Sequence, residues 1–372
     1  MEKAYRILAI NPGSTSTKIA IFTNEEMTFS RELKHSAEDL KDFHHINDQL
    51  DFRLQAVLTE LKKDGIALRE LDAVVARGGN MKPVVGGTYQ VNEEMLRDLE
   101  IGVMGQHASN LGGRIAYAIA QPLGRNAYVV DPVIVDELEP LARYSGTPLI
   151  ARKSKDHPLN QKAVGREAAK ALGGEYQDYN FIIAHLGGGI SVGTHKKGRL
   201  VDVNNSLDGD GPMSPERCGG LPFGSVMDLC FSGEYTKAEL RKKLIGGGGM
   251  VGYLGTNDGR KITERIRCGD EKAAEVYEAM AYQISKEIGA CAAVLKGQVQ
   301  VVNGTLFVYR ARVEGLVNSF ELQHFTWPPL RQSLRRSWLH RGNTCPSSTE
   351  QQGRLQRRKP RSASGRWCSG RG

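Results

Sequence analysis

The stretch ILAINPGSTSTKIAIF at residues 7–22 decides the class of fold. Apolar runs typical of buried strands flank a polar turn, NPGSTSTK at 11–18. A second stretch with the same plan, FIIAHLGGGISVG at 181–193, begins 174 residues later. In each, an apolar strand leads into a turn rich in glycine or serine, with a polar residue at the strand's exit, and a second strand returns. We interpret the pair as a duplicated α/β fold whose two turns face one another.

Helical periodicity appears between the hairpins and again after the second one. Apolar residues recur at helical spacing over 159–172, and a longer helix is predicted from a capping Asp270 to Gly297. A short apolar run at 128–130 places Asp131 at the exit of another strand. Because α/β folds bind ligands at the carboxyl ends of their strands, we expect the turns and Asp131 to line the site.

The basic charge of the chain is confined to its C-terminal part. The formal net charge is +8, but residues 301–372 hold 12 Arg and 1 Lys against 3 Glu, which leaves −2 for the first 300 residues. This part also holds all three tryptophans, and no helical or strand period persists after about Gln323. It has no RRM, KH or zinc pattern, so a nucleic-acid-associated protein is the weakest interpretation.

Composition is that of an ordinary globular chain. Of the 372 residues, 40% are hydrophobic and 25% charged, and no run of 18 apolar residues predicts a membrane span. The N-terminus leads into a strand without the apolar region of a signal peptide. Six cysteines without CxxC spacing argue against a disulfide framework or zinc site. We therefore expect a cytoplasmic protein of two domains, 1–150 and 151–300, followed by an irregular basic tail, 301–372.

The two turns are candidate phosphate sites. In the first, small hydroxyls and backbone N–H groups can hold phosphate oxygens while Lys18 supplies charge. It is not a P-loop, since GxxxxGK[ST] is absent and a strand follows. The glycines of the second let backbone approach a ligand closely. A plain polar hairpin, a tight turn and, for His185, an ordinary buried histidine remain the alternatives.

A third cluster, DVNNSLDGDGPMSPER at 202–217, is acidic and rich in glycine and ends at Arg217. It lacks the ligand spacing of an EF-hand, and a solvated connector is the alternative interpretation. Arg77 and Arg260 also lie next to glycines. Loop arginines together with Asp131 at a strand end fit charge stabilisation during phosphoryl transfer.

With these segments together, the first 300 residues resemble the acetate and butyrate kinase family, and butyrate kinases most closely. The resemblance is carried by motifs in family order: INPGSTSTK at 10–18, VARGGN at 75–80, GQHASNL at 105–111, VVDPVIVDE at 129–137, HPLNQK at 157–162, AHLGGGIS at 184–191, DVNNSLDGDGP at 202–212, SPERCG at 214–219 and YLGTNDGR at 253–260. It implies an actin-like ATPase fold of the sugar kinase/Hsp70/actin type, with a nucleotide cleft between two domains.

The resemblance also implies roles for individual residues. The catalytic residues would be Asp131, Arg217 and His157. The residues that bind nucleotide and phosphates would be Asn11, Ser14, Ser16, Lys18, His185, Gly187, Gly188, Gly189, Asp258 and Arg260. The substrate pocket would include Ala76, Arg77 and Pro215. Family members carry an arginine where Val74 stands here, so the resemblance leaves open whether Arg77 replaces it. No residue is assigned to a metal.

The implied activity is reversible, ATP- and Mg²⁺-dependent phosphorylation of a short-chain carboxylate, butyrate or a branched analogue, by an oligomer of identical subunits. The alternatives are an acetate or propionate kinase of the same family, or a catalytically dead product. A catalytically dead product is an alternative because the family pattern stops near residue 300. Codons for Val302-Asn303-Gly304, read one nucleotide later, can encode Leu-Thr-Gly, which starts the family's adenosine loop. We interpret this departure as a frameshift.

Overall fold

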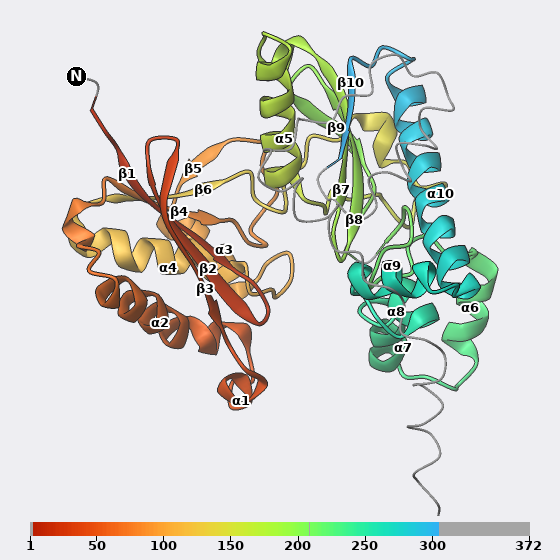
Figure 1. The fold of residues 1–372 in the computed structure, drawn as a ribbon, viewed down its shortest axis with the longest axis horizontal. Coiled ribbons are helices and arrows are strands. Elements are labelled where there is room, and N and C mark those ends of the chain that lie inside the picture. The colour runs from red at the N-terminus through yellow and green to blue at the C-terminus, as the bar shows by residue number, and fades with distance from the viewer. Residues whose placement is uncertain (1–2, 208, 305–372) are drawn as a thin grey trace, which may run out of the picture.

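The computed structural model describes residues 3–207 and 209–304, which form two α/β halves, each built on one sheet (Figure 1). The first sheet has the strand order β3-β2-β1-β4-β6-β5 and the second β10-β7-β8-β9. The strands are β1 (Arg6–Pro12), β2 (Ser16–Thr23), β3 (Glu26–Lys34), β4 (Ala73–Arg77), β5 (Thr88–Gln90), β6 (Asn126–Val130), β7 (Asn180–Leu186), β8 (Ile190–Lys196), β9 (Arg199–Val203) and β10 (Val301–Gly304).

The predicted duplication is confirmed by the topology. β1 and β2 pair antiparallel across the first turn, and β7 and β8 pair antiparallel across the second. A third antiparallel strand follows in each half, and a parallel strand, β4 or β10, lies on the other side of the first one. The orders β3-β2-β1-β4 and β9-β8-β7-β10 are therefore the same arrangement made twice.

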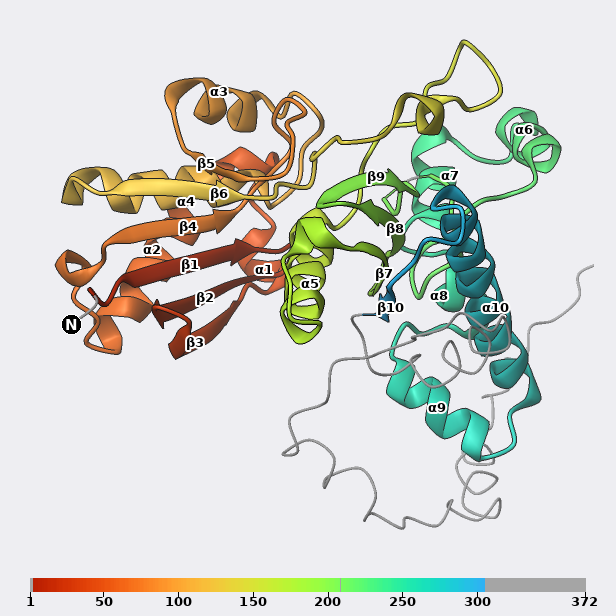
Figure 2. The ribbon, with the colours of Figure 1, turned by 90° about the horizontal axis from the view of Figure 1, so that it is seen from above.

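Helices cover both sheets, and α5 lies between the two halves (Figure 2). The α-helices are α1 (Ala37–Leu40), α2 (Leu50–Lys63), α3 (Glu93–Ile101), α4 (Asn110–Ala120), α5 (Pro158–Ala171), α6 (Phe223–Phe231), α7 (Lys237–Leu244), α8 (Gly249–Leu254), α9 (Gly259–Arg267) and α10 (Glu271–Val294). Short 3₁₀ helices are η1 (Ile46–Gln49), η2 (Leu68–Glu70), η3 (Gln121–Leu123), η4 (Pro140–Arg143) and η5 (Tyr176–Asp178). Both helices predicted from periodicity are found, as α5 and α10.

Each half has its own core. Alternation buries Leu8 and Ile10 of β1 in a cluster that also contains Val57 of α2 and Ile115 of α4. The second core joins β7 and β8 to the inner face of α10. That helix begins where predicted, since the Asp270 carboxylate accepts a hydrogen bond from the Ala273 N–H at 2.9 Å. Each sheet is therefore held by a hydrophobic core of its own half.

One boundary needs correction. The segment expected to be irregular from 301 begins with a strand: β10 pairs parallel with β7, with Val301 opposite Phe181. The remainder of that predicted tail, 305–372, lies outside the described residues. None of the helices in the described ranges has the length and apolar character needed to cross a membrane.

Candidate active site

The first turn is held from inside the protein by Arg53 of α2, which is fully buried. Its Nη1 donates to the carbonyl oxygens of Gly13 at 2.8 Å and Ser16 at 3.2 Å, and its Nη2 to that of Ser14 at 3.0 Å. Gln49 Oε1 accepts from Nε and Nη2 at 3.0 and 2.9 Å. Arg53 thus fixes the backbone of the turn while the Ser14 side chain stays exposed. No motif pointed to this residue, because it lies within a helix, away from the turn that it holds.

A cavity of about 760 Å³ lies at the exits of β1, β4 and β6, and four of the predicted residues of the first half line it, whereas Ser14, Ser16 and Asp131 do not. Asn11 and Lys18 from the first turn line it, together with Ala76 and Arg77 from the end of β4. Lys18 is exposed and lies 3.7 Å from Glu32. The cavity therefore brings the predicted phosphate turn and the predicted substrate pocket to one place.

The second turn packs against the loop that carries Arg217. A Cβ at position 189 would overlap the Arg217 guanidinium, and one at 187 would come within 2.8 Å of His185 Nε2. Glycine is required at 189, where the Ser206 backbone carbonyl would also lie within 2.9 Å of a Cβ, whereas a Cβ at 187 meets only a side chain at so short a distance. Ser214 Oγ donates to the Gly188 carbonyl at 2.6 Å and ties the loop to the turn. The structure thus joins the second and third predicted clusters.

Two histidines lie next to this turn. His157 directly precedes α5, His185 belongs to β7, and their rings stack with centroids 3.9 Å apart. Burial lowers the pKa of His157 well below its usual value, and His185, Arg77 and Arg217 lower it further. Burial also lowers the pKa of His185 to about 4, with a contribution from Arg77. Both imidazoles are therefore neutral at pH 7, and both face arginines.

His107 is a third histidine of this centre, and sequence reasoning gave it no role. Burial lowers its pKa to about 4, and Arg77 and Arg217 are the next largest causes. Its Nδ1 accepts a hydrogen bond from the Ser109 backbone N–H at 3.1 Å. The GQHASNL motif was the available signal, but a motif shared with a family does not say which of its residues reaches the site.

Val74 and Arg77 lie in different surroundings in the structure. Val74 is fully buried in the core of the first half, so it cannot face the centre. Arg77 stands at the exit of the same strand, and its charge acts on all three histidines. Burial lowers the pKa of its guanidinium, and none of the described residues forms an ion pair with it. Arg77 is therefore the β4 arginine that faces the centre.

Asp131 has different partners from the ones expected. Its backbone is left-handed, with φ of 38°, and its side chain is buried. Oδ1 accepts from the Gly87 N–H at 2.8 Å, and Oδ2 accepts from Nη1 and Nη2 of Arg166 at 3.1 and 3.0 Å. Arg166 belongs to α5, so this ion pair links the two halves. Among the residues that the structure describes, Gly87 and Arg166 bind the Asp131 carboxylate, rather than Arg217 or the stacked histidines.

The last predicted residues lie around α8 and α9. Asp258 caps α9 by accepting from the Arg260 N–H at 3.0 Å, and the same carboxylate accepts from Arg260 Nε at 3.2 Å. Asn257 donates to Glu216 at 2.7 Å and thus brings this loop beside the Arg217 loop. Pro215 is buried under α8, where its carbonyl accepts from the Val251 N–H at 3.0 Å. It does not line either of the two cavities described here.

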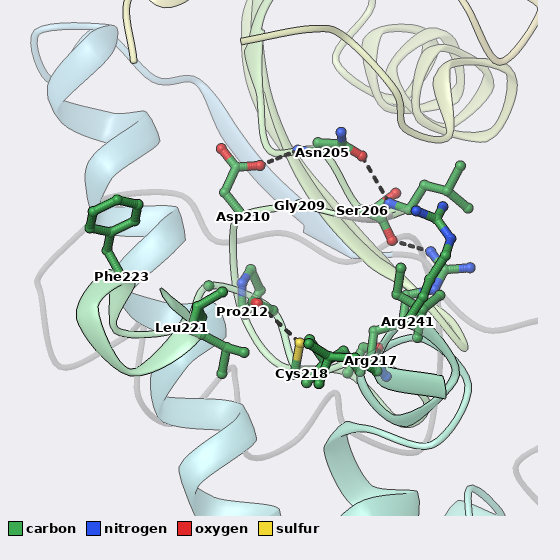
Figure 3. A pocket seen from close by; sticks show the side chains of 18 of the residues that line it. Asn205, Ser206, Gly209, Asp210, Pro212, Arg217, Cys218, Leu221, Phe223 and Arg241 are labelled. Carbon is green, nitrogen blue, oxygen red and sulfur yellow. Dashed lines mark hydrogen bonds between the residues drawn. The ribbon is translucent and has the colours of Figure 1, made fainter. Parts of the chain in front are cut away.

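A second cavity, of about 890 Å³, lies on the other side of the Arg217 loop (Figure 3). Arg217 and Arg241 lie on one side of it, and Leu221 and Phe223 lie on the opposite side. Arg217 Nη1 donates to the Ser206 carbonyl. Arg217 thus stands between this cavity and the glycine turn, whereas the stacked histidines line neither cavity.

The same strand arrangement made twice, each with a hairpin turn, together with a centre of arginines and neutral histidines, defines an actin-like ATPase fold equipped to bind anions. Solved structures share this fold. Acetate kinase of Porphyromonas gingivalis matches with a TM-score of 0.69 and 22% identity over 86% of this chain and 88% of that one. A propionate kinase from Francisella tularensis subsp. tularensis matches with a TM-score of 0.67 and 18% identity over 85% and 87%.

Sequence comparison identifies the family. The model of the acetokinase family matches residues 142–308. A probable butyrate kinase of Listeria innocua is 51% identical over 299 residues, which are 80% of this chain and 84% of that protein. Butyrate kinase 1 of Clostridium acetobutylicum is 53% identical over 298 residues, with the same two shares. The chain belongs to the acetokinase family.

Proposed function

We propose that this protein is a butyrate kinase, which transfers the γ-phosphoryl group of ATP reversibly to the carboxylate of butyrate or a branched analogue. Relatives named butyrate kinases at 51% and 53% identity support the substrate. The observation that carries the chemistry is a group of three histidines kept neutral by burial, with Arg77 acting on all three and Arg217 acting on His107 and His157. Such a centre binds anions and has no strong base, which suits an acceptor that is already an anion.

The reaction then needs positioning and charge neutralisation. A carboxylate oxygen attacks the γ-phosphorus, the bond to the β–γ bridging oxygen breaks, and ADP leaves with the electron pair. Arg77 and Arg217 offset the charge on the transferred group and on the carboxylate. The two turns hold the remaining phosphate oxygens through backbone N–H groups and hydroxyls. Asp131 belongs to the site as the residue that joins the first half to Arg166 of α5.

The cavity beside Arg77 suits the acyl chain. Its walls include the small or apolar side chains of Ala9, Ala20, Ala76 and Leu159, together with polar ones such as Ser30 and Glu32. A carboxylate paired with Arg77 would place a short hydrocarbon chain against these side chains. Each methylene changes discrimination by only ~1–3 kcal/mol, so acetate and propionate are expected to be poorer substrates rather than excluded ones. An acetate or propionate kinase is the second candidate. The solved acetate and propionate kinases named above share the fold of this chain, and this shared fold is their only contribution to the argument.

Magnesium is expected with the nucleotide. In the described residues there is no group of three or more His, Cys, Asp or Glu side chains that could hold a metal ion. Mg²⁺ keeps several waters and binds phosphate oxygens with few protein carboxylates, so its ligands would come mainly from ATP. When bound, it would neutralise charge on the β- and γ-phosphates. We assign it no protein ligand.

The test is acyl phosphate formation, trapped as the hydroxamate, with purified protein, MgATP and a series of acids. We expect kcat/KM for butyrate or isobutyrate to exceed that for acetate. A tenfold preference for acetate would reassign the protein to the acetate kinases. A folded chain with no turnover on any acid would support the catalytically dead product. Sedimentation of the same sample tests the expected oligomer of identical subunits.

A further inference from the structure

A chain of hydrogen bonds runs from the core of the second half to His157. Tyr176 Oη is bonded to His195 Nδ1, and His195 Nε2 lies 2.8 Å from Gln161 Oε1. Gln161 Nε2 lies 2.7 Å from Ser191 Oγ, which lies 2.9 Å from His157 Nδ1. The four residues behind His157 are all buried, so water does not compete for these bonds.

The orientation of the Gln161 side-chain amide determines which atom donates in each of these hydrogen bonds. Gln161 Nε2 also lies 3.4 Å from the backbone carbonyl of Ser191, and a carbonyl can only accept. The amide nitrogen must therefore face Ser191, and Oε1 must face His195. Because Oε1 only accepts, His195 carries its proton on Nε2. Burial lowers the pKa of His195 to about 3, so the ring is neutral and its Nδ1 accepts from Tyr176.

The same logic continues at Ser191. Its oxygen receives an N–H from Gln161, so its own proton points to its other close neighbour, His157 Nδ1. A neutral imidazole that accepts at Nδ1 carries its proton on Nε2. Ser206 Oγ is a more distant neighbour of the same nitrogen, at 3.5 Å. The charged and titratable groups that act on His157, namely His185, Arg77 and Arg217, all disfavour a second proton.

We propose that Gln161 and Ser191 are positioning residues that hold His157 as the Nε2–H tautomer, so that it offers a neutral hydrogen-bond donor to an anionic oxygen of the substrate. The use of this donor rests on the proposed function. A neutral donor fits beside Arg77 and Arg217, because an imidazolium there would add a third positive charge. The tautomer of His157 itself does not rest on the proposed function, because it depends only on this chain of hydrogen bonds.

The experiment observes the ring directly. Protein labelled with ¹⁵N at histidine gives two-bond ¹H–¹⁵N spectra that distinguish the two tautomers and the imidazolium. At pH 7 we expect His157 to be protonated at Nε2 alone. Ser191→Ala removes the donor to Nδ1, and a mixture of tautomers should appear. Ser191→Thr keeps the hydroxyl and should restore the wild-type pattern. A wild-type His157 that carries its proton on Nδ1, or carries both protons, would overturn the proposal.

Gln161→Glu gives a second test with little change of shape. Its carboxylate only accepts, so the Ser191 proton should turn toward it, and His157 should lose its donor. Tyr176→Phe is the matched control at the far end of the chain, where the Gln161 orientation is still fixed and His157 should keep its tautomer. Unchanged His157 spectra in both Ser191→Ala and Gln161→Glu would refute the proposal.

Kinetics separate a positioning role from a structural one. In Ser191→Ala we expect kcat to fall about tenfold, the worth of one hydrogen bond to a charged group, with KM for ATP little changed. Ser191→Thr should recover the activity. Equal kcat in wild type and Ser191→Ala would contradict the proposed use of the donor. If the wild type phosphorylates no carboxylate, the proposed function fails, but the spectra still decide the tautomer.

Discussion

The two halves of the molecule make the same hairpin and stabilise its turn in opposite ways. The first turn is held from inside, where Arg53 binds its carbonyl oxygens, so its outward side chains can be hydroxyls. The second is held from outside, where Arg217 lies against position 189 and leaves no room for a side chain. The composition of each turn, serine and threonine in one and glycine in the other, follows from the side on which its arginine lies.

The halves also differ in how far their sheets extend. In the first, β4 is followed by β6 and β5 at the outer edge. In the second, β10 stands where β4 stands in the first, and the described residues end with it at Gly304. By the duplication, a partner for β10 would come from later residues, where the sequence departs from its family. The match with butyrate kinase 1 of C. acetobutylicum likewise covers 84% of that protein.

The largest expected effect comes from completing the second half. Replacing residues 305–372 by the C-terminal part of the C. acetobutylicum butyrate kinase 1 should supply the remaining sheet and the adenosine loop that the resemblance implies. We expect ATP to bind at least 10²-fold more tightly to this hybrid than to the unaltered protein, a difference of about 2.7 kcal/mol in binding free energy. Titration calorimetry of both proteins measures it. Equal micromolar affinity would show that 305–372 is a working part of the enzyme and that no frameshift occurred.

The next effect concerns the turn held from outside. Arg217→Ala should lower kcat by on the order of 10², because a positive charge is lost where charge develops on the transferred group. Arg241→Ala is the matched control, because it removes an arginine that lines the same cavity. Steady-state rates with butyrate, measured in a form of the protein that is active, compare kcat of the two variants with that of the parent. Near-normal kcat in Arg217→Ala would remove this residue from the catalytic set.

Asp131 tests the link between the halves. Asp131→Asn keeps a residue that tolerates the left-handed backbone but removes the charge that binds Arg166. We expect kcat to fall about 10²-fold, as for a residue beside the transferred phosphoryl group. Arg166→Gln separates two explanations. If it reproduces the whole loss, then Asp131 acts by joining the halves; if activity largely survives, Asp131 acts on the substrate itself.

Much of the fold was predictable because it depends on local pattern. Strand–turn–strand periodicity predicted both hairpins, and a cap and a stop predicted α10 to within three residues of its end. Side-chain partners at long range did not follow. Arg166 is one residue in a helix rich in polar positions, and no local signal shows that its partner is Asp131.

The candidate site divides in the same way. Arg217, His157 and His185 were predicted and lie together, since each belongs to a motif at the end of a regular element. Pro215 was expected in the pocket but lies buried under α8, because the loop after Pro212 folds inward and hydrogen-bonds to that helix. The direction of a loop depends on the element that it meets, and the sequence of the loop alone does not contain that information.

Arg53 sharpens the comparison of the two turns. Arg53→Met keeps much of the length but leaves several turn carbonyls and Gln49 without their donor, so the free energy of unfolding should fall by about 3 kcal/mol. KM for ATP should rise about tenfold with a smaller change in kcat, because the phosphate turn loses its shape. The control is Arg31→Met, which removes exposed ion pairs worth ~1 kcal/mol or less. Unchanged KM in Arg53→Met would mean that the turn keeps its shape without support from inside.

The smallest effect concerns chain length, at the end of β4 in the first half. Ala76 lines the 760 Å³ cavity beside Arg77 and is 3% exposed, so a larger side chain there must enter the cavity or push into the core. Ala76→Val adds two methyl groups, and each methylene of misfit changes discrimination by ~1–3 kcal/mol. We expect kcat/KM for butyrate to fall about tenfold relative to that for acetate. Ala73→Val, at the other end of the strand and outside the cavity, should leave the ratio unchanged. If Ala76→Val slows both acids equally, the residue acts through packing, and the acyl chain must lie elsewhere, with the larger cavity beside Arg217 as the next place to test.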